Sequence, residues 1–357
     1  MGTAIKGRGA QSANVPQRFG LAERQADGDW RDAMEALDGP PVKLRTTVTE
    51  EHPKTILSFN QSPDIAFDRS INAYRGCEHG CVYCFARPTH AYHDLSPGLD
   101  FETKLFAKPQ AAELLRETLS RPKYKVAPIA MGTNTDPYQP IENGYGITRE
   151  LLEVCLETRH PVTITTKSDR VLRDLDLLAE LASHRLTAVA ISVTSLDPVL
   201  SGKLEPRAAA PEKRIAALGA LAEAGIPTHC SIAPVIPAIT DGFIEAIVAR
   251  AVAAGTQSCG WIPLRLPHEV SELFREWLDV HYPERAGKVM SIVRSIRSGK
   301  DNDPNYFSRM KPQGVWADLL RARFALACRR AGVERVRFEL DCTQFRKSGT
   351  GGQLFLL

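Results

Sequence analysis

The sequence predicts an α/β protein built on a partial (β/α)6 barrel of the TIM type, with an N-terminal extension and a helical C-terminal extension. The main observation is an alternation between about residues 70 and 280, where short β-branched or apolar runs are followed by longer amphipathic segments. Strands that alternate with helices form parallel sheets with right-handed crossovers. The alternation supplies six units, two fewer than a closed eightfold barrel needs.

Each unit begins with a short strand, and the expected strands are 71–74, 128–131, 162–166, 187–193, 228–232 and 258–263. The helices expected after them are 109–119, 147–157, 172–183, 211–224, 240–254 and 269–280. Leucine recurs every three residues from Leu172 to Leu181, as on one face of a helix. Pro211 and Gly225 stand at the start and just past the end of the fourth helix, where these residues are favoured.

The rest of the chain forms two extensions around a core at residues 61–300. Residues 1–60 are rich in glycine, proline and polar side chains, so we expect a partly disordered extension with a short helix near 29–37 and a loosely packed stretch after it. Residues 301–357 form a basic C-terminal extension. The elements expected after the last unit are helices at 285–297 and 315–331, a polar loop at 301–313, a strand-like run at 335–340 and a flexible tail from 346.

The composition is typical of a folded globular protein, since 43% of the 357 residues are hydrophobic and 24% are charged. No apolar run is long enough to span a membrane and no signal segment opens the chain, so we expect a cytoplasmic protein. The net charge is only +3, but residues 285–357 contain 15 Lys and Arg against six Asp and Glu. This segment is therefore a candidate surface for DNA or RNA, and a solvated basic face is the alternative explanation.

Three of the eight cysteines, Cys77, Cys81 and Cys84, lie within eight positions directly after the first expected strand. Three closely spaced thiolates select a soft metal, which means zinc or an iron–sulfur cluster. A cluster held by three protein thiolates leaves one iron open for a substrate. A structural zinc site needs a fourth ligand, for which the nearby candidates are His79, His90 and His93.

The CxxxCxxC spacing, with Tyr83 before the last cysteine and a barrel strand before the motif, resembles the radical S-adenosylmethionine (SAM) superfamily. The resemblance covers about residues 65–300. It implies that Cys77, Cys81 and Cys84 bind a 4Fe–4S cluster whose open iron chelates SAM. It further implies that reductive cleavage of SAM gives a 5′-deoxyadenosyl radical, which removes hydrogen from a substrate, and that an electron donor such as flavodoxin or ferredoxin is a partner.

Polar residues at the later strand ends are the expected SAM contacts. The candidates, in chain order, are Asn134, Thr135, Asp136, Lys167, Ser195 and Arg214. The first three follow the second strand and offer acceptors for the SAM ammonium group, although such residues also cap turns. The lysine is a candidate partner of the SAM carboxylate or else a solvated charge, and the last two resemble the hydroxyl and arginine that serve the ribose and carboxylate in the superfamily. No residue is singled out as catalytic.

Four stretches (132–142, 164–168, 204–218 and 231–241) resemble the branch of the superfamily related to spore photoproduct lyase, a DNA repair enzyme. Enzymes of that family return hydrogen to a thymine radical from a cysteine after the second strand, whereas residues 130–133 of this chain are Ala-Met-Gly-Thr. We therefore predict a radical SAM enzyme, of lyase or transferase type, for which nucleic acid is one candidate substrate. The alternatives are a zinc-stabilised nucleic-acid-binding protein without catalysis and a SAM-binding sensor.

Overall fold

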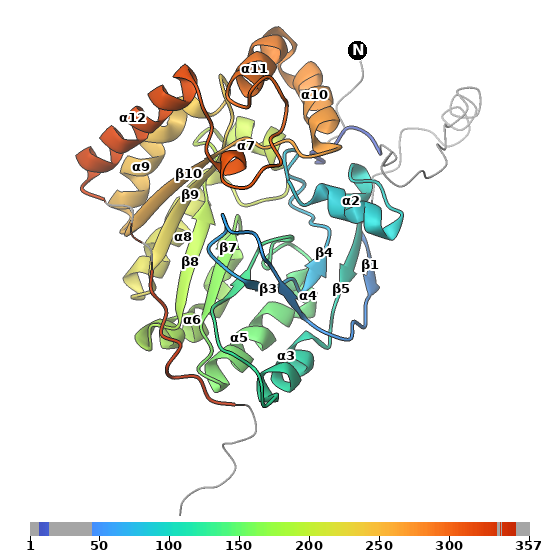
Figure 1. Cartoon of the computed structure of the whole chain (residues 1–357), viewed down its shortest axis with the longest axis vertical. Coiled ribbons are helices and arrows are strands. Elements are labelled where there is room, and N and C mark those ends of the chain that lie inside the picture. The colour runs from blue at the N-terminus through green and yellow to red at the C-terminus, as the bar shows by residue number, and fades with distance from the viewer. Residues whose placement is uncertain (1–6, 14–44, 334–335, 337, 348–357) are drawn as a thin grey trace, which may run out of the picture.

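The computed structural model describes residues 7–13, 45–333, 336 and 338–347. A seven-stranded sheet forms its centre (Figure 1). In the order in which they lie side by side, the strands are β10 (Ser258–Pro263), β9 (Thr228–Val235), β8 (Thr187–Ser192), β7 (Val162–Thr166), β6 (Ile129–Met131), β3 (Arg69–Ile71) and β2 (Leu57–Phe59). Within this sheet β3, β6, β7, β8, β9 and β10 pair in parallel and β2 pairs antiparallel to β3, which confirms the predicted partial barrel.

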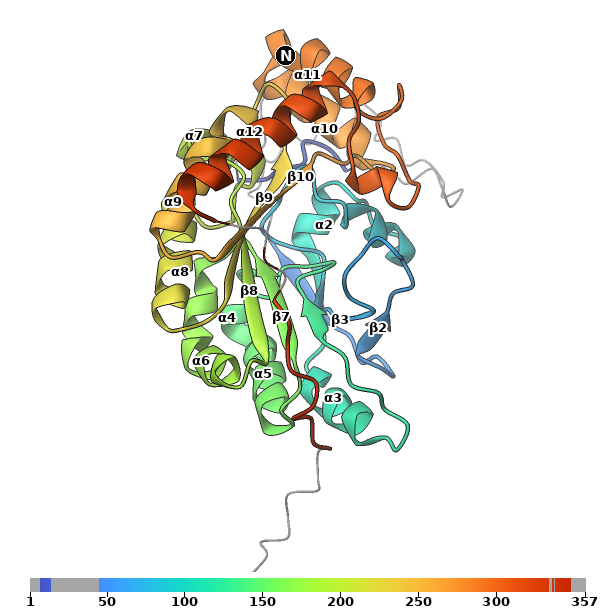
Figure 2. The ribbon, with the colours of Figure 1, turned by 60° about the vertical axis from the view of Figure 1, so that its left-hand side comes forward.

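A helix follows each of the six parallel strands and packs outside the sheet (Figure 2). These helices are α3 (Ala111–Ser120), α5 (Ile147–Glu157), α6 (Leu175–Ser183), α8 (Pro211–Glu223), α9 (Ile244–Ala253) and α10 (Val270–His281). The shorter helices α2 (Leu99–Thr103), α4 (Glu142–Tyr145) and α7 (Pro198–Leu204) lie in the connections. No helix in the described part of the chain combines the length and apolar character that crossing a bilayer requires.

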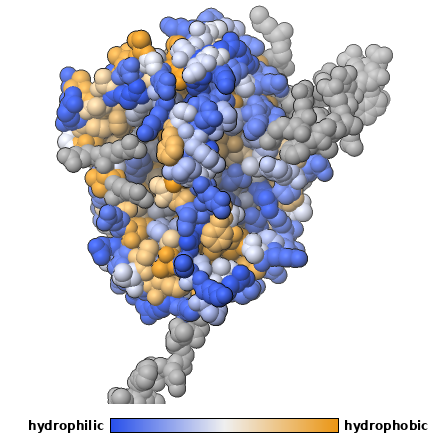
Figure 3. Space-filling model, viewed as in Figure 1, coloured by the Kyte–Doolittle hydropathy of each residue, from blue (hydrophilic) through white to orange (hydrophobic). Residues whose placement is uncertain are grey.

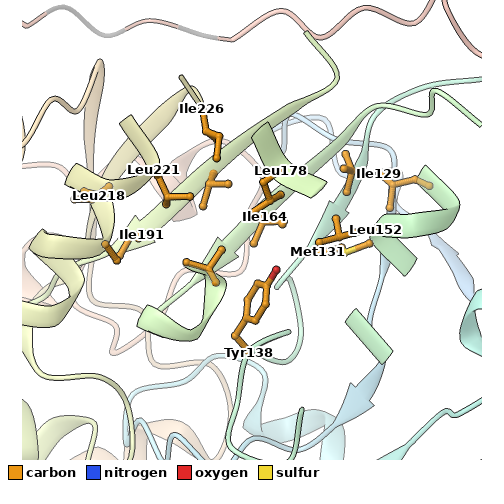
Figure 4. Packing of buried hydrophobic residues seen from close by; sticks show 14 of the residues in the cluster. Ile129, Met131, Tyr138, Leu152, Ile164, Leu178, Ile191, Leu218, Leu221 and Ile226 are labelled. Carbon is orange, nitrogen blue, oxygen red and sulfur yellow. The ribbon is translucent and has the colours of Figure 1, made fainter. Parts of the chain in front are cut away.

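The two faces of the sheet differ because side chains alternate along each strand. Strand residues such as Met131, Ile164 and Ile191 pack with helix residues such as Leu152 and Leu178 to form the main core (Figure 4). The residues between them on the strands point the other way and are small or polar: Ser70, Ala130, Thr163, Thr165, Ala190, Ser231 and Gly260. Closed barrels fill this inner space with large branched side chains, so the small residues here leave room on the concave face.

Residues 45–60 are more ordered than the sequence suggested. The strand β1 (Thr47–Glu50) pairs with β5 (Lys104–Ala107), which also pairs with β4 (Tyr74–Arg75), to give a second, three-stranded sheet. Residues 45–60 therefore supply edge strands to both sheets, where the sequence predicted a loosely packed stretch. The helix expected near 29–37 lies outside the described residues, and the division of the chain at residues 60 and 300 stays a prediction.

The helices expected after the last barrel unit are present as α11 (Pro283–Ser295) and, after the polar loop, α12 (Val315–Ala331). The strand-like run predicted at 335–340 is not found as a strand in its described residues, 336 and 338–340. This segment instead crosses the amino ends of the barrel strands. The backbone N–H groups of Asp341 and Arg346 each donate to a carbonyl, of Arg185 and Thr158, at 2.9 Å. The alternating apolar pattern therefore belongs to a tail that covers the amino ends of the barrel strands, and not to a strand of the sheet.

Candidate active site

The predicted site residues gather at the carboxyl ends of the parallel strands, which is where barrel enzymes carry their chemistry. The cysteine loop, residues 76–87, leaves β4 and reaches the ends of three neighbouring strands. Thr135, beyond β6, donates to the carbonyl of Gly76 at 2.7 Å. Tyr83 contacts Thr194, beyond β8, with 3.3 Å between their hydroxyl oxygens. The loop is thus tied to the sheet from both sides.

The three cysteines of the loop are free thiols, of which Cys77 and Cys81 are buried and Cys84 is half-buried. Backbone hydrogen bonds fix the turns between them: Cys77 N–H donates to the carbonyl of Phe101 at 2.9 Å, and Cys84 N–H donates to that of Cys81 at 3.2 Å. Burial is the main reason why the pKa values of the Cys77 and Cys81 thiols are raised. Among the described residues, no three His, Cys, Asp or Glu side chains converge as around one metal ion. Thiolates that bind different irons of a cluster need no such convergence.

A fully buried ion pair supports the cysteine loop. Arg87 Nη2 lies 2.5 Å from Glu102 Oε1, and both side chains are inaccessible to solvent. The same guanidinium donates to the carbonyls of Cys81, at 2.8 Å, and Gly98, at 2.9 Å. The position of the second cysteine thus depends on Arg87. Sequence analysis missed this residue because no local pattern marks a buried arginine or its partner 15 positions away.

Residues 7–13, the N-terminal strap, pack against the same carboxylate. The backbone N–H groups of Gly9 and Ala10 donate to the two carboxylate oxygens of Glu102 at 3.1 and 2.8 Å. A Cβ atom on Gly9 would lie 1.7 Å from the carbonyl oxygen of Gly80, so only glycine allows this approach. Disorder was expected here, but long-range hydrogen bonds that the sequence does not reveal fix the strap.

The loop after β6 carries three of the predicted SAM contacts, and the structure gives them different partners. Thr135 is buried and bonded to the cysteine loop. Asp136 accepts hydrogen bonds from Thr166 Oγ1 at 2.7 Å and from Lys167 N–H at 2.8 Å, and His79 Nδ1 lies 3.3 Å from its carboxylate. Asn134 donates through its side chain to Thr89 Oγ1 at 3.2 Å. Both oxygens of Asp136 are therefore engaged by the protein.

Electrostatics agree with a structural role for Asp136. Burial alone would raise its pKa, but the nearby His79 and the hydrogen bonds from Lys167 and Thr166 more than offset this effect and hold the pKa at about 2. The carboxylate is therefore charged at neutral pH and joins the ends of β6 and β7 to the cysteine loop.

The remaining predicted contacts lie at the ends of β7 and β8. Lys167 is half-buried, and its ammonium group lies 5.8 Å from the centre of the Tyr83 ring. Ser195 is buried and accepts a hydrogen bond from Asp197 N–H at 2.9 Å, which shapes the turn before α7. Arg214 is buried; it donates to the carbonyls of Ala209 and Ser192 and pairs with Glu205.

Glu205 connects Arg214 to the cysteine loop. Its carboxylate accepts hydrogen bonds from Tyr83 and, at 2.8 Å, from Thr194 Oγ1. The sequence marks Tyr83 only as part of the cysteine motif and indicates no role for Glu205. The aromatic residue before the last cysteine therefore bonds to a carboxylate that the arginine neutralises. This buried network fixes the loop against β8 and α8.

A polar cavity of about 270 Å³ lies near the ends of β3 and β6. Asn134 lines it together with Asn72, which follows β3, and with Arg75 and Lys108. Lys108 is buried and donates to the carbonyl of Asn72 at 2.7 Å. Burial, and then the charge of Arg75, lower the pKa of Lys108 to about 8. The cavity is therefore lined by cationic and amide side chains, and one of them, that of Arg75, belongs to a residue two positions before Cys77 in the sequence.

The arginines of the basic C-terminal segment are partly used within the protein. Arg323 makes two hydrogen bonds, at 2.7 and 2.8 Å, to the carboxylate of Glu245 on α9, and Arg321 pairs with Asp318. Arg329 and Arg330 at the end of α12 are exposed. Hydrophilic residues cover most of the face in Figure 3, with hydrophobic residues in separate patches. Arg335 and Arg337 lie outside the described residues.

The fold and the site together define an α/β protein with a half-open barrel and a three-cysteine loop at the carboxyl ends of its strands. Comparison with known proteins agrees. The model of the radical SAM superfamily matches residues 71–251. The chain is 36% identical over 242 residues to an uncharacterised protein of Mycobacterium tuberculosis (66% of this chain, 71% of the relative) and 31% identical over 214 residues to one of Methanocaldococcus jannaschii (60% and 76%). The chain belongs to the radical SAM superfamily.

Solved structures resemble the fold. Spore photoproduct lyase complexed with dinucleoside spore photoproduct gives a TM-score of 0.57 at 14% identity, covering 88% of this chain and 85% of that chain. A mutant of the same lyase with bound AdoMet and dinucleoside spore photoproduct gives 0.54 at 13% identity, with coverage of 87% and 84%. These likenesses show a shared fold with this lyase, and the family model confirms the predicted superfamily.

Proposed function

We propose that this protein is a radical SAM enzyme whose 4Fe–4S cluster is held by Cys77, Cys81 and Cys84. The observation that carries the proposal is the cysteine loop itself, with three free thiols held by separate backbone hydrogen bonds at the carboxyl end of a partial barrel. When bound, the cluster and SAM supply a 5′-deoxyadenosyl radical that removes hydrogen from a substrate. The protein's own residues position the loop, bind SAM and keep water away.

Within that proposal, the candidate SAM contacts divide into two groups. Asn134 and Lys167 are the direct contacts, because Asn134 lines the polar cavity and Lys167 has no carboxylate partner among the described residues. The positioning residues, whose hydrogen-bonding atoms protein groups already occupy, are Thr135, Asp136, Ser195 and Arg214. The enzyme needs an external reductant, and flavodoxin or ferredoxin is the donor that we propose.

The test is anaerobic. The wild-type protein, reconstituted with iron and sulfide and then reduced, is expected to hold about four irons per chain and to convert SAM to 5′-deoxyadenosine. Cys81→Ala should lose both properties. Cys342→Ala changes a cysteine far from the loop in sequence and serves as the matched control, expected to retain both. A colourless wild-type protein that binds zinc and makes no 5′-deoxyadenosine would refute the proposal in favour of a zinc-stabilised binding protein.

A further inference from the structure

Two arginines at the carboxyl end of β10 have no acidic partner. Arg297, which follows α11, is only 3% exposed and donates to the carbonyls of Leu264 at 2.6 Å and Arg309 at 3.1 Å. Arg265, just beyond β10, reaches Met310 Sδ at 3.5 Å. Among the described residues neither guanidinium forms an ion pair, and the Nε atom of each is buried without a hydrogen-bond partner.

The charge of Arg265 acts on Arg297, and the charge of Arg309 acts on Arg265. Burial is the main cause that lowers the pKa of each, and the positive charge of Arg265 lowers that of Arg297 further, to about 10. Asp303 is the one carboxylate that favours the charged form of both, and Asp64, which also faces Arg265, is bound by Arg309. Paired cations removed from water are costly unless an anion joins them. A phosphate group suits them, since its oxygens accept two N–H bonds from one guanidinium.

Two aromatic residues, Tyr306 and Phe307, lie in the same segment as Arg309 and Met310, which Arg297 and Arg265 contact. Tyr306 and Phe307 are 54% and 52% exposed. The Arg309 guanidinium lies 4.9 Å from the centre of the Tyr306 ring, and Phe307 N–H donates to Asp64 at 2.9 Å. Phe307 has a φ of +64°, which a bulky residue rarely adopts. Exposed aromatic rings that the surrounding contacts hold in place are platforms on which nucleobases stack.

We propose that Arg265, Arg297, Tyr306 and Phe307 bind one nucleotide unit of the substrate, the arginines taking its phosphate and an aromatic ring stacking on its base. The inference rests on the proposed function, since it assigns the substrate class of that same barrel mouth. The nucleotide unit belongs either to a free nucleotide or to a nucleic acid strand. The exposed arginines at the end of α12 are the competing surface.

Binding is measured on the full-length, anaerobically purified protein by fluorescence anisotropy. The probe is a fluorescein-labelled single-stranded oligothymidylate of about ten nucleotides, titrated at several salt concentrations, with dTMP and inorganic phosphate as competitors. Arg265→Gln should weaken binding roughly tenfold and reduce the salt dependence by the loss of one phosphate contact, a slope change of about 0.7. Phe307→Ala should weaken binding without changing the salt slope. Arg329→Gln on α12 is the matched control and should bind as the wild type does.

Competition by dTMP at concentrations like those of the oligonucleotide would support a free nucleotide, and competition by unlabelled oligonucleotide alone would support a strand. Unchanged binding in Arg265→Gln, or an equal loss in Arg329→Gln, would overturn the inference, and so would inorganic phosphate competing as well as dTMP. Phe307→Ala changes an exposed side chain and keeps the test valid if Arg265→Gln does not fold. Formation of 5′-deoxyadenosine is assayed separately, so its failure would refute the proposed function and leave the binding result standing.

Discussion

Arg309 and Asp64 lie 245 positions apart in the sequence and form a two-point ion pair, with Nε and Nη2 of the arginine 2.7 and 2.6 Å from the two carboxylate oxygens. Asp64 belongs to the connection between β2 and β3, and β2 is one edge of the seven-stranded sheet. Arg309 contacts Arg297, which is bonded in turn to Leu264 just beyond β10, the other edge. The pair therefore links the two edges that a closed barrel would join by strand pairing.

Replacing this arginine tests the link. In Arg309→Gln we expect amide hydrogen exchange to become at least several-fold faster in residues 60–68 and 301–313, because each segment loses its anchor to the other. Exchange in the central strands β7 and β8 should be unchanged. Arg250→Gln removes an ion pair with Glu212 on the outer helices and should leave both segments as they are. Equal exchange in Arg309→Gln and the wild type would show that the pair does not hold them together.

Disrupting the buried ion pair of Arg87 and Glu102 is expected to have a large effect on stability. Glu102→Gln leaves the charge of Arg87 buried without a counter-charge, so the free energy of unfolding of the cluster-free protein should fall by about 3–5 kcal/mol. Urea unfolding measures this loss. The exposed pair of Arg116 and Glu157 provides the comparison, and Arg116→Gln should cost about 1 kcal/mol or less. Similar losses in the two variants would contradict the role given to Glu102.

The N-terminal strap depends on one glycine. In Gly9→Ala the added methyl group collides with the carbonyl of Gly80, so the strap should detach and amide exchange in the cysteine loop should increase. A Cβ at Gly287, in α11, meets no atom within 4 Å, and Gly287→Ala is expected to behave as the wild type. Mass spectrometry of exchanged peptides measures both variants. A cysteine loop equally protected in Gly9→Ala would mean that the strap does not cover it.

The lowered pKa of Lys108 predicts that the stability of the protein depends on pH. Its pKa is about 8 in the folded protein against 10.5 in the unfolded chain, so between these values the unfolded state holds a proton that the folded state lacks. The free energy of unfolding therefore rises with pH in this window through Lys108. Relative to Lys108→Met, the wild type should gain at most about 3 kcal/mol from pH 8 to 10.5, measured by urea unfolding at both pH values. A constant difference between the two proteins would contradict this prediction.

Much of the fold could be predicted from the sequence because its signals are local. All six parallel strands and the helices after them were expected within a few residues of where they lie, since apolar runs and helical periodicity act over a dozen positions. The strands β1, β2 and β5 were missed, since they have only four, three and four residues and pair only where a partner strand is already present. The candidate site was predicted in the same way, by which residues follow each strand.

The partners of those site residues could not be predicted. Asp136 was expected to meet SAM, and the structure shows its carboxylate engaged by Thr166, Lys167 and His79. By itself the sequence determined the barrel, the cysteine spacing and the superfamily, because each is encoded by residues close together in the chain. Only the tertiary structure decided which polar side chains remain free and which are bonded, because hydrogen bonds and ion pairs form between residues that meet only once the chain has folded.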